Sequence, residues 1–459
     1  MNKKIIIVCL FSLLIFSCDW FNPGDIDSSG NFWAQDFRFW PYRHYRVDAE
    51  LLWEGLYCNV WVEKGSGTSL VQAQKVGNEY DNKIRQQMID VFSSENITYS
   101  GRSFSDIMEV ADWLGDKDDK LCILLLDIRD SYIKGINDSY IAGYFWSGDF
   151  FNLTNSNRRD MIYIDTNPGM ENIEELFSTL AHEMQHMMNF VTSLTVRSGT
   201  MDTWIDEGLS SAAEWLYSGY SRSRIDWFIN NGNKSGSMKG LIDKGNNFFV
   251  WGNYQNENDY YAILDDYSTV YLFFQWLRLQ AGDDIYRKII SSANSDYRAV
   301  VNAVNVNSNY PNWETLLRTW LAANFINAAS GQFGYMNDDV LKEIKVPVPS
   351  NIGLTVMLAP GEGVYSAANT TPNITGQGSN IKNAYLTNTV TTVYQSSSTM
   401  LTFNSNTNFR GNAESGATTG VTPPATAIIV PLGGRSIVSG DDKPYRIGAW
   451  DRLVVSNEE

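Results

Sequence analysis

The sequence predicts an α+β fold: a mixed β-sheet in the first part of the chain, helices in the middle and a β-rich segment at the end. Before residue 170, short apolar runs bounded by turn residues are typical of strands, with helical patterns between them. Residues 171–330 carry apolar side chains mainly at helical spacing. Beyond residue 330 the chain is rich in Ser, Thr, Asn and Gly with short apolar alternations, which favours a β-sandwich.

The length of 459 residues suffices for roughly two or three domains with a substantial core. We expect one domain over residues 33–330, divided into a mixed half (33–170) and a helical half (171–330), and a β-rich domain over residues 331–459. The net charge is −17, and Lys and Arg form no run beyond the N-terminus. Because a phosphate-binding surface needs a basic patch, this charge argues against nucleic-acid binding.

Residues 1–18 resemble a bacterial lipoprotein signal peptide. Two lysines precede an apolar run at residues 5–16, which suits a secretory signal and is short for a membrane span. Cleavage before Cys18 would leave a lipidated N-terminus, with residues 19–32 as a tether. A plain signal peptide that contains a cysteine is the alternative. We therefore expect the protein outside the cytoplasm, in the bacterial cell envelope, anchored to the membrane by lipid on Cys18.

Two cysteines, Cys58 and Cys122, remain beyond this segment. Both lie in apolar, strand-like runs, LYCNVWV and LCILLLD. These surroundings leave a disulfide and two buried thiols equally open. Neither cysteine has the CxxC-type spacing of a zinc ligand.

In the first half, the predicted elements alternate between strands and helices. They are an aromatic-rich, strand-like stretch at residues 33–63, a helix at 69–92, a short helix at 106–114, and strands at 121–127, 140–151 and 161–165. His44 lies among aromatic residues, where a structural role is more common than metal binding.

The residues that carry chemistry begin in a predicted helix at Leu176–Phe190, LFSTLAHEMQHMMNF. Its apolar residues form one stripe at helical spacing. His182 and His186 lie off this stripe, four residues apart, so both imidazoles project from one face and can bind one metal ion. Glu183 beside them can take a proton from a metal-activated water.

A bare HExxH also occurs by chance on amphipathic helices that bind nothing. Two observations favour a metal site here: two of the chain's three histidines belong to the motif, and a second motif follows at a suitable distance. The start of the helix also fits, because Asn172 with Glu175 three residues later forms a candidate capping box.

A second predicted helix, Thr203–Tyr217, carries the candidate third ligand. A catalytic zinc site usually has three protein ligands and one open position, so the two histidines need one more partner. Glu207 is the best candidate, and Asp206, which points about 100° away around the helix, is the weaker one. Glu214, on the face of Glu207, is a candidate for supporting a ligand from outside, with a solvated carboxylate as the alternative.

HExxH followed by a W-x-x-E-G-x-S/A helix resembles the zinc peptidases whose third ligand is glutamate, the gluzincins. The segments LAHEMQHMMNF, WIDEGLSSAAEW and DYSTVYLFFQWLRLQAG are most similar to the hyicolysin family of bacterial zinc metallopeptidases, over residues 40–330 or so. The resemblance implies a gluzincin-like domain and a zinc-dependent endopeptidase whose Zn²⁺ is held by the two histidines and Glu207. It also implies that Glu183 and Tyr267 are catalytic, since a tyrosine that opens the later helix assists catalysis in that family.

Two other interpretations remain open. One is a non-catalytic surface lipoprotein or adhesin with a structural or vestigial metal site, which the predicted anchor and the Ser/Thr/Asn-rich C-terminal part support. The other is a zinc aminopeptidase, because Gly169–Asn172 reads GMEN, like the element that binds a substrate's free amine in those enzymes. There the element lies much further upstream of HExxH, so we expect a protein or peptide substrate that is cleaved internally.

The helical half continues with an Asn/Gly-rich stretch at residues 218–262, predicted as a long loop over the cleft, with disorder as the alternative. Helices are then predicted at residues 267–280, 285–292 and 313–328. In the gluzincin layout an edge strand beside the catalytic helix pairs with extended substrate, and Gly143–Trp146 is our expectation for it.

Overall fold

The computed structural model describes residues 30–346 except 40–41, 94–97, 100–101, 104–119, 137–138, 151–152, 198–199, 231–244, 247–260 and 306–309. Beyond residue 346 it describes only the strands at 355–357, 363–367, 373–375, 381–385, 399–404 and 426–431. The predicted lipoprotein signal, nearly all of the tether, the short helix at 106–114 and most of the predicted loop at 218–262 lie outside the described residues.

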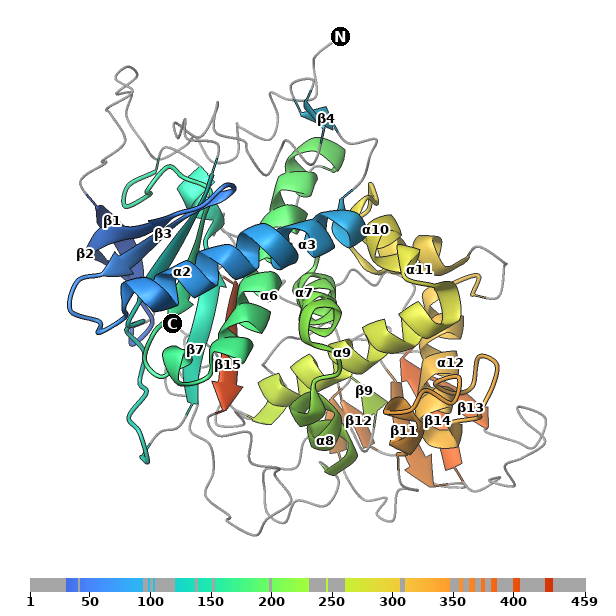
Figure 1. The fold of residues 1–459 in the computed structure, drawn as a ribbon. Helices are drawn as coiled ribbons and strands as arrows, with labels where there is room; N and C mark the ends of the chain where they lie inside the picture. Colours follow the sequence, from blue (N-terminus) through green and yellow to red (C-terminus); the bar gives the residue numbers. More distant parts are fainter. Residues whose placement is uncertain are drawn as a thin grey trace.

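The architecture confirms a mixed α+β fold, with a seven-stranded sheet on one side of the protein (Figure 1). Its strands, in spatial order, are β1 (Asn31–Asp36), β2 (Arg43–Glu54), β3 (Cys58–Glu63), β6 (Leu121–Leu126), β8 (Met161–Asp165), β7 (Ser139–Phe145) and β15 (Thr426–Pro431). β3, β6 and β8 are parallel neighbours, and the other neighbouring pairs are antiparallel. The runs LCILLL of β6 and MIYID of β8 are wholly buried, as expected of parallel strands inside a sheet.

The first helical segment lies against this sheet. It comprises α2 (Leu70–Glu79), a π-helical turn (Tyr80–Ile84) and α3 (Arg85–Phe92), in agreement with the helix predicted at residues 69–92. Ser69 caps its start through a capping box with Gln72. Apolar residues spaced along the segment, including Tyr80 and Met88, bury it in the larger core.

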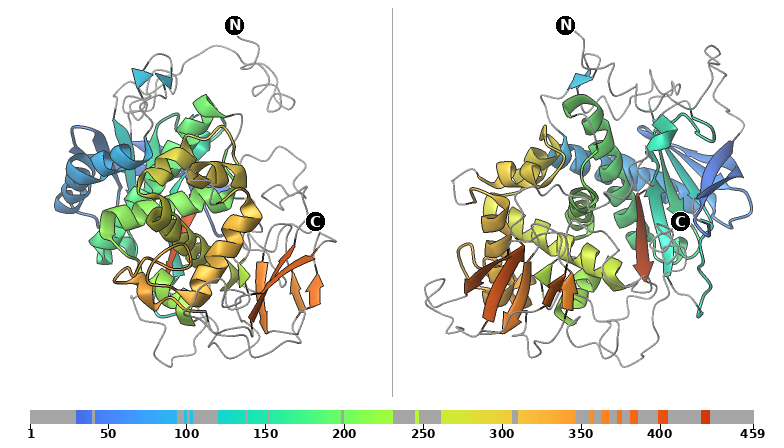
Figure 2. Two further views of the ribbon diagram at one scale, coloured as in Figure 1. Left: turned by 90° about the vertical axis from the view of Figure 1, so that its right-hand side faces the viewer. Right: turned by 180° about the vertical axis from the view of Figure 1, so that it is seen from behind.

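The remaining α-helices form the other side of the protein (Figure 2). The first of them, α6, lies between the sheet and the helices that follow it. The remaining helices are α6 (Ile173–Val196), α7 (Thr203–Ser218), α8 (Arg222–Asn230), α9 (Tyr261–Ala281), α10 (Asp284–Ile290), α11 (Tyr297–Val304) and α12 (Trp313–Ile326). α9 begins six residues earlier than predicted, α11 was not predicted, and α8 lies at the start of the predicted loop. Of the helices in the described ranges, none combines the length and apolar character needed to cross a membrane.

The sheet separates two hydrophobic cores. Alternate residues of β6 point to opposite faces, so that Ile123 packs with the helices and Leu124 packs with residues of β1 and β2. Cys58 belongs to the first core and Cys122 to the second. The two thiols therefore lie on opposite faces of the sheet and form no disulfide, so buried thiols are the alternative that holds.

The C-terminal part is β-rich, as predicted, but its described strands do not support a separate β-sandwich. β10 (Thr355–Met357) and β12 (Asn373–Thr375) form a two-stranded parallel sheet. β11 (Gly363–Ala367), β13 (Ile381–Tyr385) and β14 (Thr399–Asn404) form a four-stranded sheet with β9 (Gly245–Asn246), which comes from the predicted loop. This sheet lies beside α12, whereas β15 belongs to the large sheet.

The expectation that Gly143–Trp146 forms an edge strand is wrong. β7 pairs with β8 on one side and with β15 on the other, with Thr426 opposite Phe145 and Pro431 opposite Ser139. The pairing partner of β7 comes from a segment almost three hundred residues further along the chain. Local sequence carries no signal for such a distant pairing, because strand register depends on the fold as a whole.

Candidate metal centre

The HExxH residues lie on α6, whose apolar stripe holds it in the larger core. The buried residues of this stripe are Leu176, Phe177, Leu180, Ala181, Met184 and Met188. Gly143 in β7 lets the helix approach the sheet closely, because a Cβ there would lie 2.9 Å from Thr179 Cγ2. The predicted capping box is wrong: Asn172 occupies the N-cap position, but its side chain interacts with the Glu175 side chain and does not cap the helix.

The two histidines and Glu207 converge in the protein interior. The rings of His182 and His186 have centroids 4.7 Å apart, and their side chains are 0% and 1% exposed. Glu207 reaches them from α7: its Oε2 lies 3.3 Å from His182 Nε2 and 3.6 Å from His186 Nε2. The polar face of α6 that carries the two histidines is therefore buried against α7.

The chemistry of these three atoms fits a metal ion. Among the described residues, His182, His186 and Glu207 form a group whose ligand atoms all lie within 4.8 Å of one another. The two Nε2 atoms and Glu207 Oε2 are buried and have no hydrogen-bond partner in the described part of the chain, which is costly unless a cation satisfies them. Two atoms bound at about 2.05 Å to one tetrahedral zinc lie about 3.3 Å apart, close to the distances from Glu207 to the histidines.

The charges around this group also favour a cation. Burial alone would raise the pKa of Glu207, but the charge of His186 and the close approach of both imidazoles lower it to about 2. Burial lowers the pKa of His182, yet Glu207 and Glu214 raise it above its ordinary value. When both imidazoles are neutral, the carboxylates give this group a net negative charge. Added positive charge, supplied by protons or by a metal ion, therefore stabilises it.

Each histidine is held in its orientation by polar partners at Nδ1, the ring nitrogen that is not among the three facing atoms. His182 Nδ1 lies 2.6 Å from Glu214 Oε1, and His186 Nδ1 lies 3.0 Å from Asp206 Oδ2 and 3.0 Å from Ser210 Oγ. A carboxylate at Nδ1 keeps the proton there and leaves the Nε2 lone pair for a metal. Asp206, the weaker candidate ligand, therefore lies behind His186, and Glu214 lies where a supporting residue belongs.

Glu183 lies in the same interior with no hydrogen-bond partner for either carboxylate oxygen among the described residues. Burial raises its pKa to about 7, although the two histidines and the backbone amide of Phe145 act in the opposite direction. A carboxyl group that titrates near neutrality can both accept and donate a proton at physiological pH.

Tyr267 comes from α9 and is fully buried. Burial raises its pKa well above the ordinary value, and the charges of Glu207, Glu183 and Glu214 act in the same direction, so the hydroxyl keeps its proton. The ring is connected to the surroundings of the histidines through Arg224, whose guanidinium carbon lies 4.4 Å from the ring centroid and which pairs with Glu214. Tyr267 is the seventh residue of α9, so it lies within the helix and does not open it.

His44, by contrast, packs against Trp146, with ring centroids 4.9 Å apart. Burial lowers its pKa, which is the behaviour of a structural histidine that is neutral at physiological pH. It is not part of the metal-binding group.

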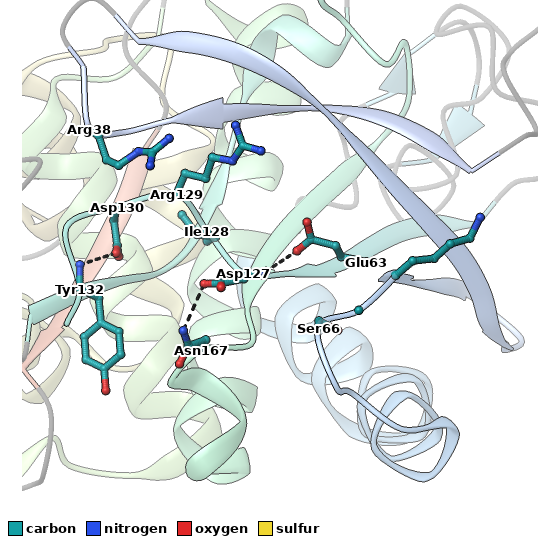
Figure 3. A pocket seen from close by; sticks show the side chains of 11 residues that line it. Arg38, Glu63, Ser66, Asp127, Ile128, Arg129, Asp130, Tyr132 and Asn167 are labelled. Atoms are coloured by element: carbon teal, nitrogen blue, oxygen red, sulfur yellow. Dashed lines mark hydrogen bonds between the residues drawn. The ribbon is translucent and has the colours of Figure 1, made fainter. Parts of the chain in front are cut away.

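A pocket lies at the end of β6 and is lined by none of these residues (Figure 3). Its lining includes Arg38, Asp127, Arg129, Asp130 and Asn167. The carboxylates here hold loops in place: Asp130 accepts hydrogen bonds from the backbone amides of Tyr132 and Ile141, and Glu63 accepts one from that of Asp127. None of the residues predicted to be functional lines this pocket.

The glycine after the third candidate ligand is needed for packing. A Cβ at Gly208 would overlap the ring of Phe274 in α9. Gly208→Ala should gain about 0.5–1 kcal/mol of helix propensity but lose about 1–3 kcal/mol to overpacking. We therefore expect a lower free energy of unfolding in urea. Gly169→Ala is the control, because its Cβ would meet Asp165 Oδ2 at an ordinary 3.4 Å; equal stability of both variants would contradict the packing argument.

Comparison with known proteins agrees with the motifs. No protein-family model matches the chain. The chain is 32% identical to the neutral metalloprotease ShpI of Staphylococcus hyicus over 270 residues, which cover 57% of this chain and 54% of that protein. It thus spans about half the length of this relative. The predicted resemblance to a family of bacterial metallopeptidases is confirmed by this similarity.

Proposed function

We propose that the protein is a zinc-dependent endopeptidase that hydrolyses peptide bonds within a protein or peptide substrate. The observation that carries the proposal is the convergence of His182, His186 and Glu207, whose three facing atoms are buried without hydrogen-bond partners. The similarity to a neutral metalloprotease supports peptide hydrolysis as the activity. Zinc is the metal that best suits two imidazoles and one carboxylate.

In this proposal His182, His186 and Glu207 hold Zn²⁺, which when bound supplies Lewis-acid activation of water and of the scissile carbonyl. Glu183 takes a proton from the attacking water and gives it to the leaving amine, which its pKa of about 7 permits at neutral pH. Tyr267 stays protonated and donates a hydrogen bond to the carbonyl oxygen as negative charge develops there. One such donor contributes on the order of 3 kcal/mol to the transition state.

Two observations favour an endopeptidase over the alternatives. An aminopeptidase needs a carboxylate near the metal for the substrate's amine, but Glu171 of the GMEN stretch pairs with Lys134 at 2.6 Å and is not part of the metal-binding group. A structural zinc site needs a fourth protein ligand, whereas the candidate group in the described part of the chain has three members. An open position is the arrangement of a catalytic site.

We also propose that the enzyme acts in the bacterial cell envelope, held at the membrane by lipid on Cys18. The support is the sequence of residues 1–18, a basic start and an apolar run that ends in Ser17 and Cys18. Metabolic labelling with a radioactive fatty acid is expected to label the wild-type protein and to leave a Cys18→Ala variant unlabelled.

The experiment that tests the function combines metal analysis with proteolysis. The purified protein is expected to contain about one zinc ion per chain. It should cleave an unfolded protein, lose this activity when a chelator removes the metal, and regain it when zinc is restored. A protein that binds no metal, or whose cleavage survives complete removal of the metal, would contradict the proposal.

A further inference from the structure

Arg224, a residue of α8, contacts two groups around the metal-binding site at once. Its Nη2 lies 3.5 Å from Glu214 Oε1, and its guanidinium carbon lies 4.4 Å from the centroid of the Tyr267 ring. Only 9% of Arg224 is exposed. Burying a guanidinium is costly unless it is paired, so both contacts matter for where its side chain lies.

The first contact links Arg224 to the metal-binding group through Glu214. The oxygen of Glu214 that pairs with Arg224 is also the one 2.6 Å from His182 Nδ1. The carboxylate of Glu214 therefore lies between the guanidinium of Arg224 and the imidazole of His182. A carboxylate at Nδ1 fixes the orientation of the imidazole and leaves Nε2 as a donor to metal.

The second contact, between Arg224 and Tyr267, affects the orientation of the aromatic ring. A flat guanidinium over an aromatic face is attracted by the ring's quadrupole and restricts how the ring can tilt. Tyr267 also belongs to the larger hydrophobic core, so its ring lies between apolar neighbours and the guanidinium of Arg224. Fixing this ring fixes the direction of the hydroxyl that the proposed function uses.

We propose that Arg224 is a positioning residue with two separable tasks: its charge holds Glu214, and through it His182, while its planar face holds Tyr267. The inference rests on the proposed function, because it assigns these two groups to metal binding and to the carbonyl oxygen. It concerns a residue in the stretch that the sequence suggested was a polar loop.

The two tasks predict different outcomes for two substitutions. Arg224→Gln removes the charge and the cation above the ring, so zinc affinity should fall by about tenfold or more, as for other partners of metal-bound histidines. Arg224→Lys keeps a charge for Glu214 but loses the planar group. Its zinc affinity should stay close to that of the wild type, while its kcat should fall by about tenfold, less than the roughly 10²–10³-fold loss for removing such a donor altogether.

The matched control is Arg222→Gln on the same helix. Arg222 is 57% exposed and pairs with Asp226 and Glu343, neither of which belongs to the metal-binding group. Zinc affinity is measured by competition with a chromophoric chelator, kcat and KM are measured on an unfolded protein substrate, and thermal unfolding of the metal-free variants checks the fold. The control should match the wild type in zinc affinity, kcat and KM.

Three results would overturn the inference. They are wild-type zinc affinity in Arg224→Gln, an equal loss of zinc affinity in Arg224→Lys, or wild-type kcat in Arg224→Lys. If Arg224→Gln does not fold, Glu214→Gln interrupts the same link from its other end and should show the same loss of zinc affinity; if it binds zinc as the wild type does, the link is refuted. A wild-type protein that binds no zinc would refute the proposed function itself, so the two failures are distinguishable.

Discussion

Replacing Glu183 with Gln is expected to abolish peptide hydrolysis and to leave the zinc content unchanged. The amide has nearly the same shape as the carboxyl group but cannot accept the proton of the attacking water, and loss of a general base costs about 10²–10⁴ in rate. Glu183 is not among the three residues whose ligand atoms converge, so metal binding does not need its charge. Metal analysis and kcat/KM on an unfolded protein, measured on the same preparation, test both parts.

Glu174→Gln is the matched control for this experiment. Glu174 lies in the first turn of the same helix and is exposed, so its variant should cleave at the wild-type rate. Cleavage by Glu183→Gln at the wild-type rate would show that another group is the base. Loss of zinc from Glu183→Gln would show instead that this carboxylate helps to bind the metal.

The second large effect is expected at the third ligand. Glu207→Ala should lose zinc during dialysis and should therefore lose hydrolysis, because only two imidazoles remain to hold the ion. Asp206→Ala, its neighbour on α7, removes the partner of His186 Nδ1. Loss of such an outer partner weakens metal binding by about 10–100-fold, so Asp206→Ala should keep its zinc when the metal is supplied in excess.

Metal analysis before and after dialysis separates these two variants. The reverse result, with zinc retained by Glu207→Ala and lost by Asp206→Ala, would assign the ligand to Asp206. An equal loss in both would mean that the variants act through the packing of α7, which their thermal unfolding curves would reveal.

The parts of the fold that were predictable from sequence are those set by local periodicity. The apolar stripe of α6, with its two histidines off the stripe, specifies both a helix and the face on which a metal can bind. The run LCILLL of β6 specifies a buried strand in the same way. Glu207 could be chosen over Asp206 because neighbouring helix positions point about 100° apart.

The parts that were missed depend on contacts between distant segments. The faces of Cys58 and Cys122 follow from the register of β3 against β6, which neither local run specifies. The miss at Asn172 is local instead: the residue type and spacing are those of a cap, yet the side chain interacts with that of Glu175. Arg224 lies in a polar stretch without strong periodicity, and its importance arises only because α8 packs against α9.

The pairing of β7 with residues 426–431 has a consequence for how a polypeptide can reach the sheet. β15 contacts α6 and begins opposite Phe145, whose amide lies near Glu183. Any incoming strand that hydrogen-bonds to β7 on this side must first displace β15. Binding of such a strand is therefore an exchange of one backbone partner of β7 for another. The apparent affinity for such a ligand is then reduced by the fraction of molecules in which residues 426–431 remain in place.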